Sequence, residues 1–119
     1  MKTLDDLMID NEDLKGLFTW DDAQEQIEMF NSLSYKGFSN WRLPTRDEFD
    51  KINLKRDEIS GFNSFRYLKR NKICGYSTDG YWSSSEYDAD SAWIHYFGHG
   101  YQNYGSKYYT KLVRCVRSI

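Results

Sequence analysis

The clearest structural signals lie in residues 37–49, which read GFSNWRLPTRDEF. Within this stretch Thr45 and Glu48 have the spacing of a capping box, in which each side chain accepts a hydrogen bond from the other residue's backbone N–H. This spacing predicts a helix that begins after Thr45 and buries Phe49 and Ile52. The residues before the capping box are expected to form a turn and then a short extended segment.

Toward the N-terminus, residues 19–33 carry a second helical pattern. Thr19 offers a hydroxyl N-cap, and Asp21 and Asp22 place carboxylates in the first turn, where the helix dipole favours negative charge. Apolar side chains recur at helical spacing: Trp20, Ala23, Ile27 and Phe30. We therefore expect an amphipathic helix from about residue 20 to Leu33.

After residue 79 the apolar residues change from helical spacing to alternation. A first strand is expected at residues 81–84 and a second at residues 93–97. In the second strand, alternation places one set of side chains inward: Trp93, His95 and Phe97. It sends the other set outward, toward solvent: Ile94 and Tyr96.

Two further strands are expected near the C-terminus. One starts at Tyr101, and a turn at residues 105–107 leads into the last strand, residues 108–117. Both faces of that last strand carry apolar residues, so we expect a central strand covered on both sides. Arg114 lies within it, and its guanidinium is therefore expected to be held by a buried carboxylate or by backbone carbonyls.

These elements predict the fold class and the domain organisation. Two helices followed by a twisted antiparallel sheet make an α+β domain. The 119 residues fit a single domain, 1–119, with residues 1–6 as a candidate linker.

Composition and charge narrow the classes of partner. No stretch reaches the about 20 apolar residues of a membrane span, so we expect no membrane insertion. The N-terminus lacks the apolar core of a signal peptide, which leaves localisation unassigned. A net charge of -2 and a pI near 5.6 argue against a nucleic-acid partner.

Five blocks of sequence resemble a known family. The blocks are Thr19-Trp20 with Ala23, residues 37–45 with Glu48-Phe49, residues 81–85, Ala92-Trp93 with Phe97 and Gly100, and residues 113–117. Together they resemble the Lcl C-terminal domain family, a domain of unknown function found in bacterial adhesins and other surface proteins. The resemblance implies a C-type-lectin-like fold and a protein that is on the cell surface, secreted or virion-associated. Residues 42–49 also resemble a segment of the formylglycine-generating sulfatase-modifying enzymes, which share that fold.

The two cysteines, Cys74 and Cys115, depart from the family's pattern. In the family a cysteine of the first helix commonly pairs with the cysteine of the terminal strand, but here Ile27 stands at the aligned position. We therefore expect Cys115 to be a buried free thiol, with a disulfide between Cys74 and Cys115 as the alternative.

Catalytic and metal sites have little support in the sequence. His95 is expected in the core, and His99 lies between two glycines with no Ser or Cys beside it to act as a nucleophile. Glu86, Asp88 and Asp90 offer oxygen ligands of the kind that calcium takes, but a solvated acidic loop is the simpler interpretation. We expect no catalytic residue, no metal and no cofactor.

Residues 94–109 contain half of the chain's ten tyrosines, interleaved with small and polar residues. Tyrosine combines a large contact area with a polar tip at low entropic cost, which is the chemistry of an antibody paratope. We predict that nine residues of this segment bind a ligand: Ile94, Tyr96, His99, Tyr101, Asn103, Tyr104, Ser106, Tyr108 and Tyr109. The alternative is that several of these rings only cover the sheet edge. The segment also resembles the variable region of diversity-generating retroelement proteins, which display diversified residues on a C-type-lectin-like scaffold.

The sequence therefore predicts a non-enzymatic module that binds a protein or glycan ligand on another surface, in receptor or host-surface recognition. The alternatives are a carbohydrate- or glycosaminoglycan-binding adhesin domain and a structural module of a surface or virion assembly. No oligomeric state is implied. Five residues are predicted to be structural rather than ligand-binding: Trp41, Trp82, Trp93, Arg114 and Cys115. The three tryptophans among them are expected to be buried.

Overall fold

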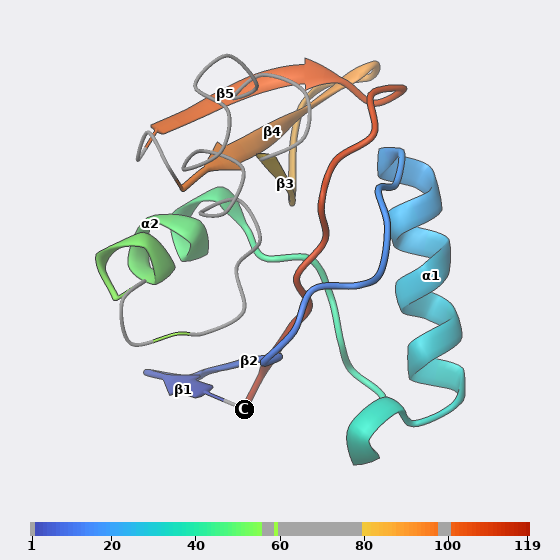
Figure 1. Ribbon diagram of the computed structural model, residues 1–119, viewed down its shortest axis with the longest axis vertical. Helices are drawn as coiled ribbons and strands as arrows, with labels where there is room; N and C mark the ends of the chain where they lie inside the picture. The colour runs from blue at the N-terminus through green and yellow to red at the C-terminus, as the bar shows by residue number, and fades with distance from the viewer. Residues whose placement is uncertain (1, 56–58, 60–79, 98–100) are drawn as a thin grey trace.

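In the described part of the chain, two α-helices and two small antiparallel sheets build the fold, which confirms the α+β class (Figure 1). The computed structural model describes residues 2–55, 59, 80–97 and 101–119, without the side chains of Lys2 and Tyr101. The helices are α1 (Trp20–Ser32), the short 3-10 helix η1 (Tyr35–Gly37) and α2 (Arg46–Leu54). The strands are β1 (Lys2–Leu4), β2 (Leu7–Ile9), β3 (Gly80–Asp88), β4 (Ser91–Tyr96), β5 (Tyr101–Ser106) and β6 (Val116–Ser118).

Both predicted helices are confirmed, and each begins at its predicted cap. The Thr19 hydroxyl accepts a hydrogen bond from the Asp22 N–H at 3.2 Å, at the start of α1. At α2 the capping box is complete, because the Glu48 N–H donates to Thr45 Oγ1 at 3.1 Å and the Thr45 N–H donates to Glu48 Oε1 at 2.8 Å. Arg42 fixes that carboxylate with two further bonds of 2.6 and 2.7 Å. The signals are local in the chain, so the sequence alone was enough to find them.

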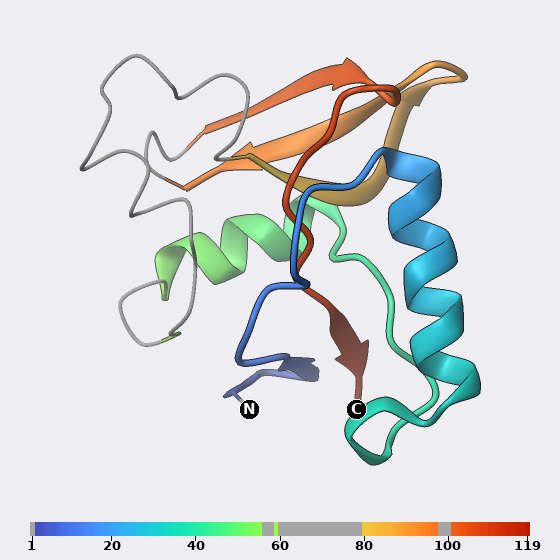
Figure 2. The same ribbon diagram turned by 45° about the vertical axis from the view of Figure 1, so that its right-hand side comes forward.

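Three of the four predicted strands are confirmed, and they form the antiparallel sheet β3-β4-β5, in which β4 is the middle strand. Trp82, Ile94 and Asn103 lie opposite one another across its three strands. The second sheet, β1-β2-β6, pairs the start of the chain with its end (Figure 2). Lys2–Leu4, which lie within the candidate linker at residues 1–6, therefore pair with β2 as part of this sheet.

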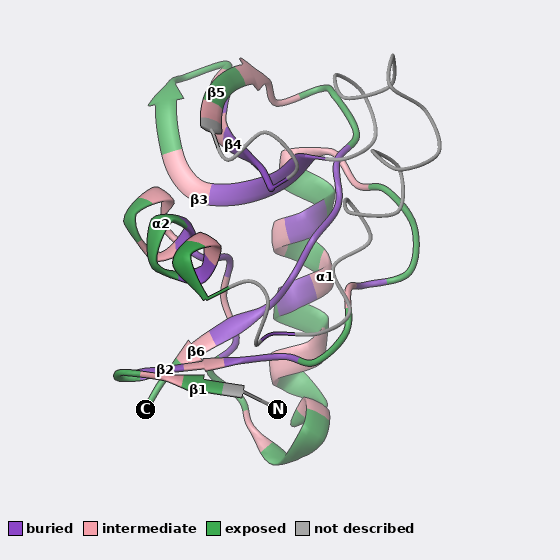
Figure 3. Ribbon diagram, turned by 60° about the vertical axis from the view of Figure 1, so that its left-hand side comes forward, coloured by how far each residue is buried: buried purple, intermediate pink, exposed green. Residues whose placement is uncertain are grey.

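The C-terminal segment differs from the single strand predicted at residues 108–117. Strand β5 continues to Ser106, so the expected turn begins about two residues later, and only Val116–Ser118 forms a named strand. Between them Lys111 and Leu112 make isolated bridges to Phe18 and Tyr81, and Val116, the first residue of β6, also bridges to Arg42. A continuous ladder is lost because the pairing partner changes along the segment. Burial on both faces is confirmed, since residues 111–116 are all buried (Figure 3).

Strand β4 is covered on both faces, and this overturns one prediction. Ile94 and Tyr96, expected to face solvent, are only 1% and 7% exposed. They pack into a core with Trp82 and with buried side chains of α1. Alternation identified which side chains share a face but not whether a second layer covers that face. His95, on the opposite face, is a core residue as predicted, with its ring stacked on Phe49 at 5.2 Å between centroids.

Two of the three tryptophans predicted to be buried are buried in the structure. Trp41 and Trp82 are 2% and 0% exposed, as expected. Trp93 is only half-buried, so the prediction was wrong for this residue. Its ring contacts the Arg46 guanidinium and the exposed rings of Tyr87 and Tyr104 rather than fully buried side chains alone.

Arg114 is held in the way that its buried position predicts. Its Nε and Nη2 lie 2.9 and 2.8 Å from Asp13 Oδ1, and its Nη1 donates to the Asp10 carbonyl at 2.8 Å. The side chains of Arg114 and Asp13 are 0% and 2% exposed. This fully buried ion pair joins residues 10–13 to the C-terminal segment.

Cys115 is a free and fully buried thiol, which confirms the preferred expectation. Cys74 lies outside the described residues. Burial raises the pKa of the Cys115 thiol to about 12, and the nearby negative charge of Asp10 adds to that shift. The thiol therefore stays protonated far above physiological pH.

We predict that Cys115 does not react with a thiol reagent until the protein unfolds. In a Cys74→Ser variant at pH 8, the aromatic disulfide reagent DTNB should release no chromophore from the native protein and one equivalent from protein in denaturant, because only an exposed thiolate attacks the reagent. The raised pKa also means that the native state holds this proton more tightly than the unfolded chain, so stability should fall as the pH rises from about 9 toward 12. Rapid labelling under native conditions would contradict this assignment.

Candidate functional site

A pocket of about 600 Å³ lies beside β4, β5 and the segment that follows them. Its lining residues are Ile94, Tyr96, Asn103, Tyr104, Gly105, Tyr108, Tyr109, Thr110 and Lys111. Six of the nine residues predicted to bind a ligand are among them. We call this the tyrosine pocket.

The inner part of the tyrosine pocket is formed by β4 and by Gly105 of β5. Ile94 and Tyr96 contribute from buried positions, so they line the pocket without being displayed on the surface. A Cβ at Gly105 would lie 2.8 Å from Ile94 Cδ1 and 3.2 Å from the ring of Tyr109. Glycine is needed at this position because it lets the Tyr109 ring lie directly against the strand.

The outer part of the pocket consists of exposed tyrosines. Tyr104, Tyr108 and Tyr109 are 47%, 82% and 57% exposed. The Tyr104 ring stacks on Tyr87 with 3.8 Å between centroids, so it also reaches the sheet face that carries Trp93. Tyr108 and Tyr109 are the rings most available to a ligand at the pocket itself.

Lys111 is a pocket residue that the sequence analysis missed. The residue is only 2% exposed, and its Nζ donates to Tyr96 Oη at 3.5 Å. The same ammonium lies 5.5 Å from the centre of the Tyr96 ring and 5.8 Å from that of Tyr109, within cation–π range. The sequence did contain a signal for this role. Lys111 stands at the start of an apolar segment and directly follows four residues, two of which are tyrosines.

The other three predicted binding residues are not part of the described pocket. Ser106 shapes the turn after β5, where its hydroxyl accepts a hydrogen bond from the Tyr108 N–H at 3.2 Å. Tyr101 pairs with Tyr96 through the backbone, and its side chain is outside the description. His99 lies outside the described residues.

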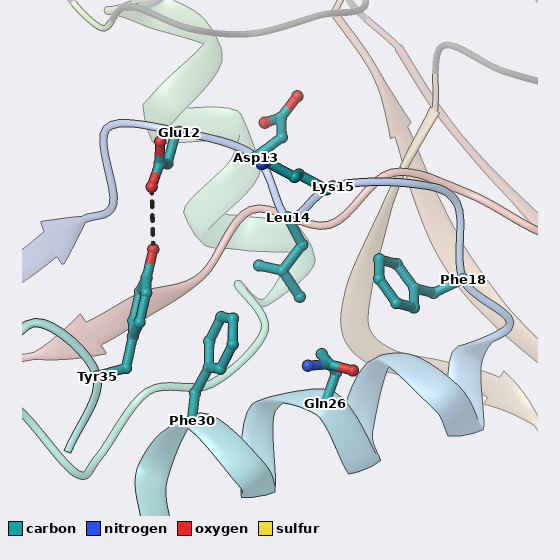
Figure 4. A pocket seen from close by; sticks show the side chains of 8 residues that line it. All are labelled: Glu12, Asp13, Leu14, Lys15, Phe18, Gln26, Phe30 and Tyr35. Carbon is teal, nitrogen blue, oxygen red and sulfur yellow. Dashed lines mark hydrogen bonds between the residues drawn. The ribbon is translucent and has the colours of Figure 1, made fainter. Parts of the chain in front are cut away.

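A second pocket, of about 450 Å³, lies between residues 12–18 and α1 (Figure 4). Leu14, Phe18 and Phe30 point into it, and the Tyr35 hydroxyl donates to Glu12 at 3.3 Å along its edge. Burial raises the pKa of Tyr35 to about 12, with its hydrogen bond to Asp10 adding to the shift. The polar groups of this pocket are largely engaged in holding residues 10–13 in place.

The tyrosine pocket offers contact area, hydroxyl groups, one amide and one buried ammonium. Across the described part of the chain, His, Cys, Asp and Glu side chains form no group of three that would hold a metal ion. Among the described helices, none combines the length and the apolarity needed to cross a bilayer.

Comparison with known proteins places the chain in a family. No curated protein matches it. The family model described as the Lcl C-terminal domain matches residues 4–117, which is nearly the whole chain and includes every described element except the first two residues of β1 and the last residue of β6. The chain therefore belongs to the Lcl C-terminal domain family.

Proposed function

We propose that this protein is a non-enzymatic ligand-binding module which presents a tyrosine-rich surface on a C-type-lectin-like scaffold. Its ligand is a protein or glycan on another surface, and its role is receptor or host-surface recognition by a protein that is surface-exposed, secreted or virion-associated. The observation that carries the proposal is the tyrosine pocket, where rings from β4, β5 and residues 108–109 meet around one cavity.

The size and composition of the pocket support binding. A volume of about 600 Å³ lies in the usual range for ligand sites and accommodates a protein side chain or a sugar ring. Tyr108 and Tyr109 are both more than half exposed, so a ligand can contact their rings and their hydroxyl groups. Rings of this kind carry much of the energy in protein interfaces.

Lys111 favours one alternative, a glycan with acidic groups. A buried ammonium beside tyrosine hydroxyls suits an anionic ligand group as well as a protein carbonyl. A salt titration separates the two ligand classes, because a sulfated glycan should be released steeply as salt rises, whereas an interface dominated by tyrosine should not.

The proposal is tested by the double variant Tyr108→Ser/Tyr109→Ser. We expect the melting temperature to stay nearly unchanged, because both rings are mostly exposed. Ligand binding should fall by about thirtyfold or more, since even one hot-spot truncation costs on the order of 2 kcal/mol. Glycan arrays and displayed surface-protein arrays, probed with the wild type and the variant, provide the measurement.

A matched control removes exposed apolar side chains elsewhere. Leu33 and Leu54 are 73% and 82% exposed and do not line the tyrosine pocket, so Leu33→Ser/Leu54→Ser should bind like the wild type. If the tyrosine variant unfolds, its rings were part of the core. If it stays folded and binds every array ligand normally, the pocket is not the binding site.

A further inference from the structure

We propose a second binding site, on the opposite face of the β3-β4-β5 sheet, where Arg46 recognises a carboxylate of an acidic protein segment. We call it the Arg46 site. Its residues are Arg46, Tyr87, Trp93, Gln102 and Tyr104. Tyr104 belongs to both sites, but the other four residues of the Arg46 site do not line the tyrosine pocket. The argument for the Arg46 site does not depend on ligand binding in that pocket.

The backbone of Arg46 is fixed to the sheet on both sides. Arg46 is the first residue of α2, which lies against one face of the sheet (Figures 1 and 2). Its N–H donates to Ser85 Oγ at 3.1 Å, and its carbonyl accepts from Gln102 Nε2 at 2.7 Å. Residues of β3 and β5 therefore hold the start of the helix in place.

The guanidinium of Arg46 is oriented as well. Its Cζ lies 3.5 Å from the centre of the Trp93 ring, which is contact distance for a guanidinium stacked on an aromatic face. Its Nε donates to Gln102 Oε1 at 3.1 Å. Two contacts in different directions thus fix the plane and the rotation of the group before any ligand arrives.

The orientation leaves the outer end of the guanidinium available. Among the residues that the structure describes, neither Nη1 nor Nη2 of Arg46 has a hydrogen-bond or ion-pair partner. Arginine has five N–H donors, and Nε uses one, so four remain on the two terminal nitrogens. Such a planar pair of donors matches a carboxylate, which accepts two parallel hydrogen bonds from it.

Nearby carboxylates already have other partners. Asp50 accepts from Gln102 Nε2 at 3.1 Å, Glu48 is bound by Arg42 at 2.6 Å, and Glu86 is bound by Lys107 at 3.0 Å. In the described structure none of these three acids pairs with Arg46. The carboxylate that we propose for Arg46 therefore comes from another molecule.

The surroundings indicate a protein ligand. Tyr87 and Tyr104 stack with an interplanar angle of 3°, are each about half exposed, and meet the Trp93 ring edge-on at 5.7 and 5.8 Å. An aromatic wall therefore stands beside the cation. Trp, Tyr and Arg together are the side chains most enriched at the energetic centres of protein interfaces. Because the arginine is already ordered, binding would cost little side-chain entropy.

The experiment uses Trp93 as an internal reporter. The Glu peptide is an acetylated, amidated hexapeptide of alternating Leu and Glu. The Gln peptide is the same hexapeptide with Gln in place of Glu. Each peptide is titrated to millimolar concentration. We expect the Glu peptide, but not the Gln peptide, to give a saturable change in tryptophan fluorescence. This fluorescence change should be lost in the Trp93→Phe variant. Binding of the Glu peptide to that variant is followed instead by the fluorescence anisotropy of a labelled peptide.

Two substitutions of Arg46 test the recognition itself. Arg46→Gln and Arg46→Lys should both weaken the Glu peptide by roughly tenfold, because lysine keeps the charge but loses the paired donors and the stacking. Lys51→Gln is the matched control, since it removes an exposed positive charge from the same helix and should bind like the wild type. Thermal unfolding of each variant verifies that it is folded.

The remaining outcomes overturn the proposal. Equal binding of the Glu and Gln peptides, full binding by Arg46→Gln, or no saturable response would each exclude carboxylate recognition by Arg46. Binding of a hyaluronan hexamer without binding of the Glu peptide would assign the site to acidic glycans instead. The Tyr108→Ser/Tyr109→Ser variant should leave all peptide titrations unchanged, so failure of one proposal is distinguishable from failure of the other.

Discussion

Replacing Trp82 by alanine is expected to abolish cooperative folding or to lower the melting temperature sharply. Trp82 is fully buried in the core between β4 and α1, and its Nε1 donates to the Phe18 carbonyl at 2.7 Å. Truncation of a buried tryptophan usually costs about 3–5 kcal/mol. A domain's whole stability is typically about 5–15 kcal/mol, so this single change removes a large share of it.

Most of that loss should come from packing. The Phe18 carbonyl also accepts the Lys111 N–H at 2.8 Å, so it keeps a partner when the indole is removed. Trp82→Phe, which retains a ring, should therefore be destabilised much less than Trp82→Ala. Circular dichroism melts of both variants provide the comparison. A well-folded Trp82→Ala protein that lost only ligand binding would instead place Trp82 in the binding site.

Arg114→Met should yield a folded but strongly destabilised protein, with a loss of about 3–5 kcal/mol. The change leaves the buried carboxylate of Asp13 without its cation and the Asp10 carbonyl without the Arg114 donor. The Tyr81 hydroxyl also donates to Asp13, at 2.6 Å, but a hydroxyl does not neutralise the charge. Urea denaturation, monitored by circular dichroism, measures the loss.

A compensating substitution distinguishes a buried charge from lost packing. In Arg114→Met/Asp13→Asn the carboxylate is replaced by a neutral amide whose oxygen can still accept from Tyr81. If the unpaired charge causes the loss, the double variant should be more stable than Arg114→Met alone. Equal stability of the two would show that the carboxylate is not what makes Arg114 necessary.

The parts of the fold that the sequence predicted well are those with local causes. The starts of α1 and α2 follow from Thr19, Thr45 and Glu48, each acting within three residues along the chain. The sequence predicted that Arg114 is paired, because burying an unpaired charge costs free energy, but it did not predict which carboxylate is the partner. Asp13, its partner, is 101 positions away in the chain.

The parts that the sequence did not predict depend on contacts between distant segments. Strand β2 pairs with β6 through residues more than 100 positions apart, and β1 joins this sheet only through β2. A three-residue strand also has no recognisable pattern of its own. Six of the nine predicted residues of the tyrosine-rich segment line the tyrosine pocket, but the exposure of Ile94 depended on whether a second layer covers β4. The sequence assigned no role to Arg46 because its contacts with Trp93 and Gln102 join segments that are distant in the chain.

The pairing of β1, β2 and β6 has a mechanical consequence. A force applied between the two ends of the chain enters through this small sheet, reinforced by the bond from the Ile119 N–H to the Asp6 carbonyl at 2.8 Å. The β3-β4-β5 sheet, with both proposed binding sites, lies at the other end of the molecule (Figure 1). Under tension the short strands should therefore yield first, and the larger sheet should bear load only after they have separated.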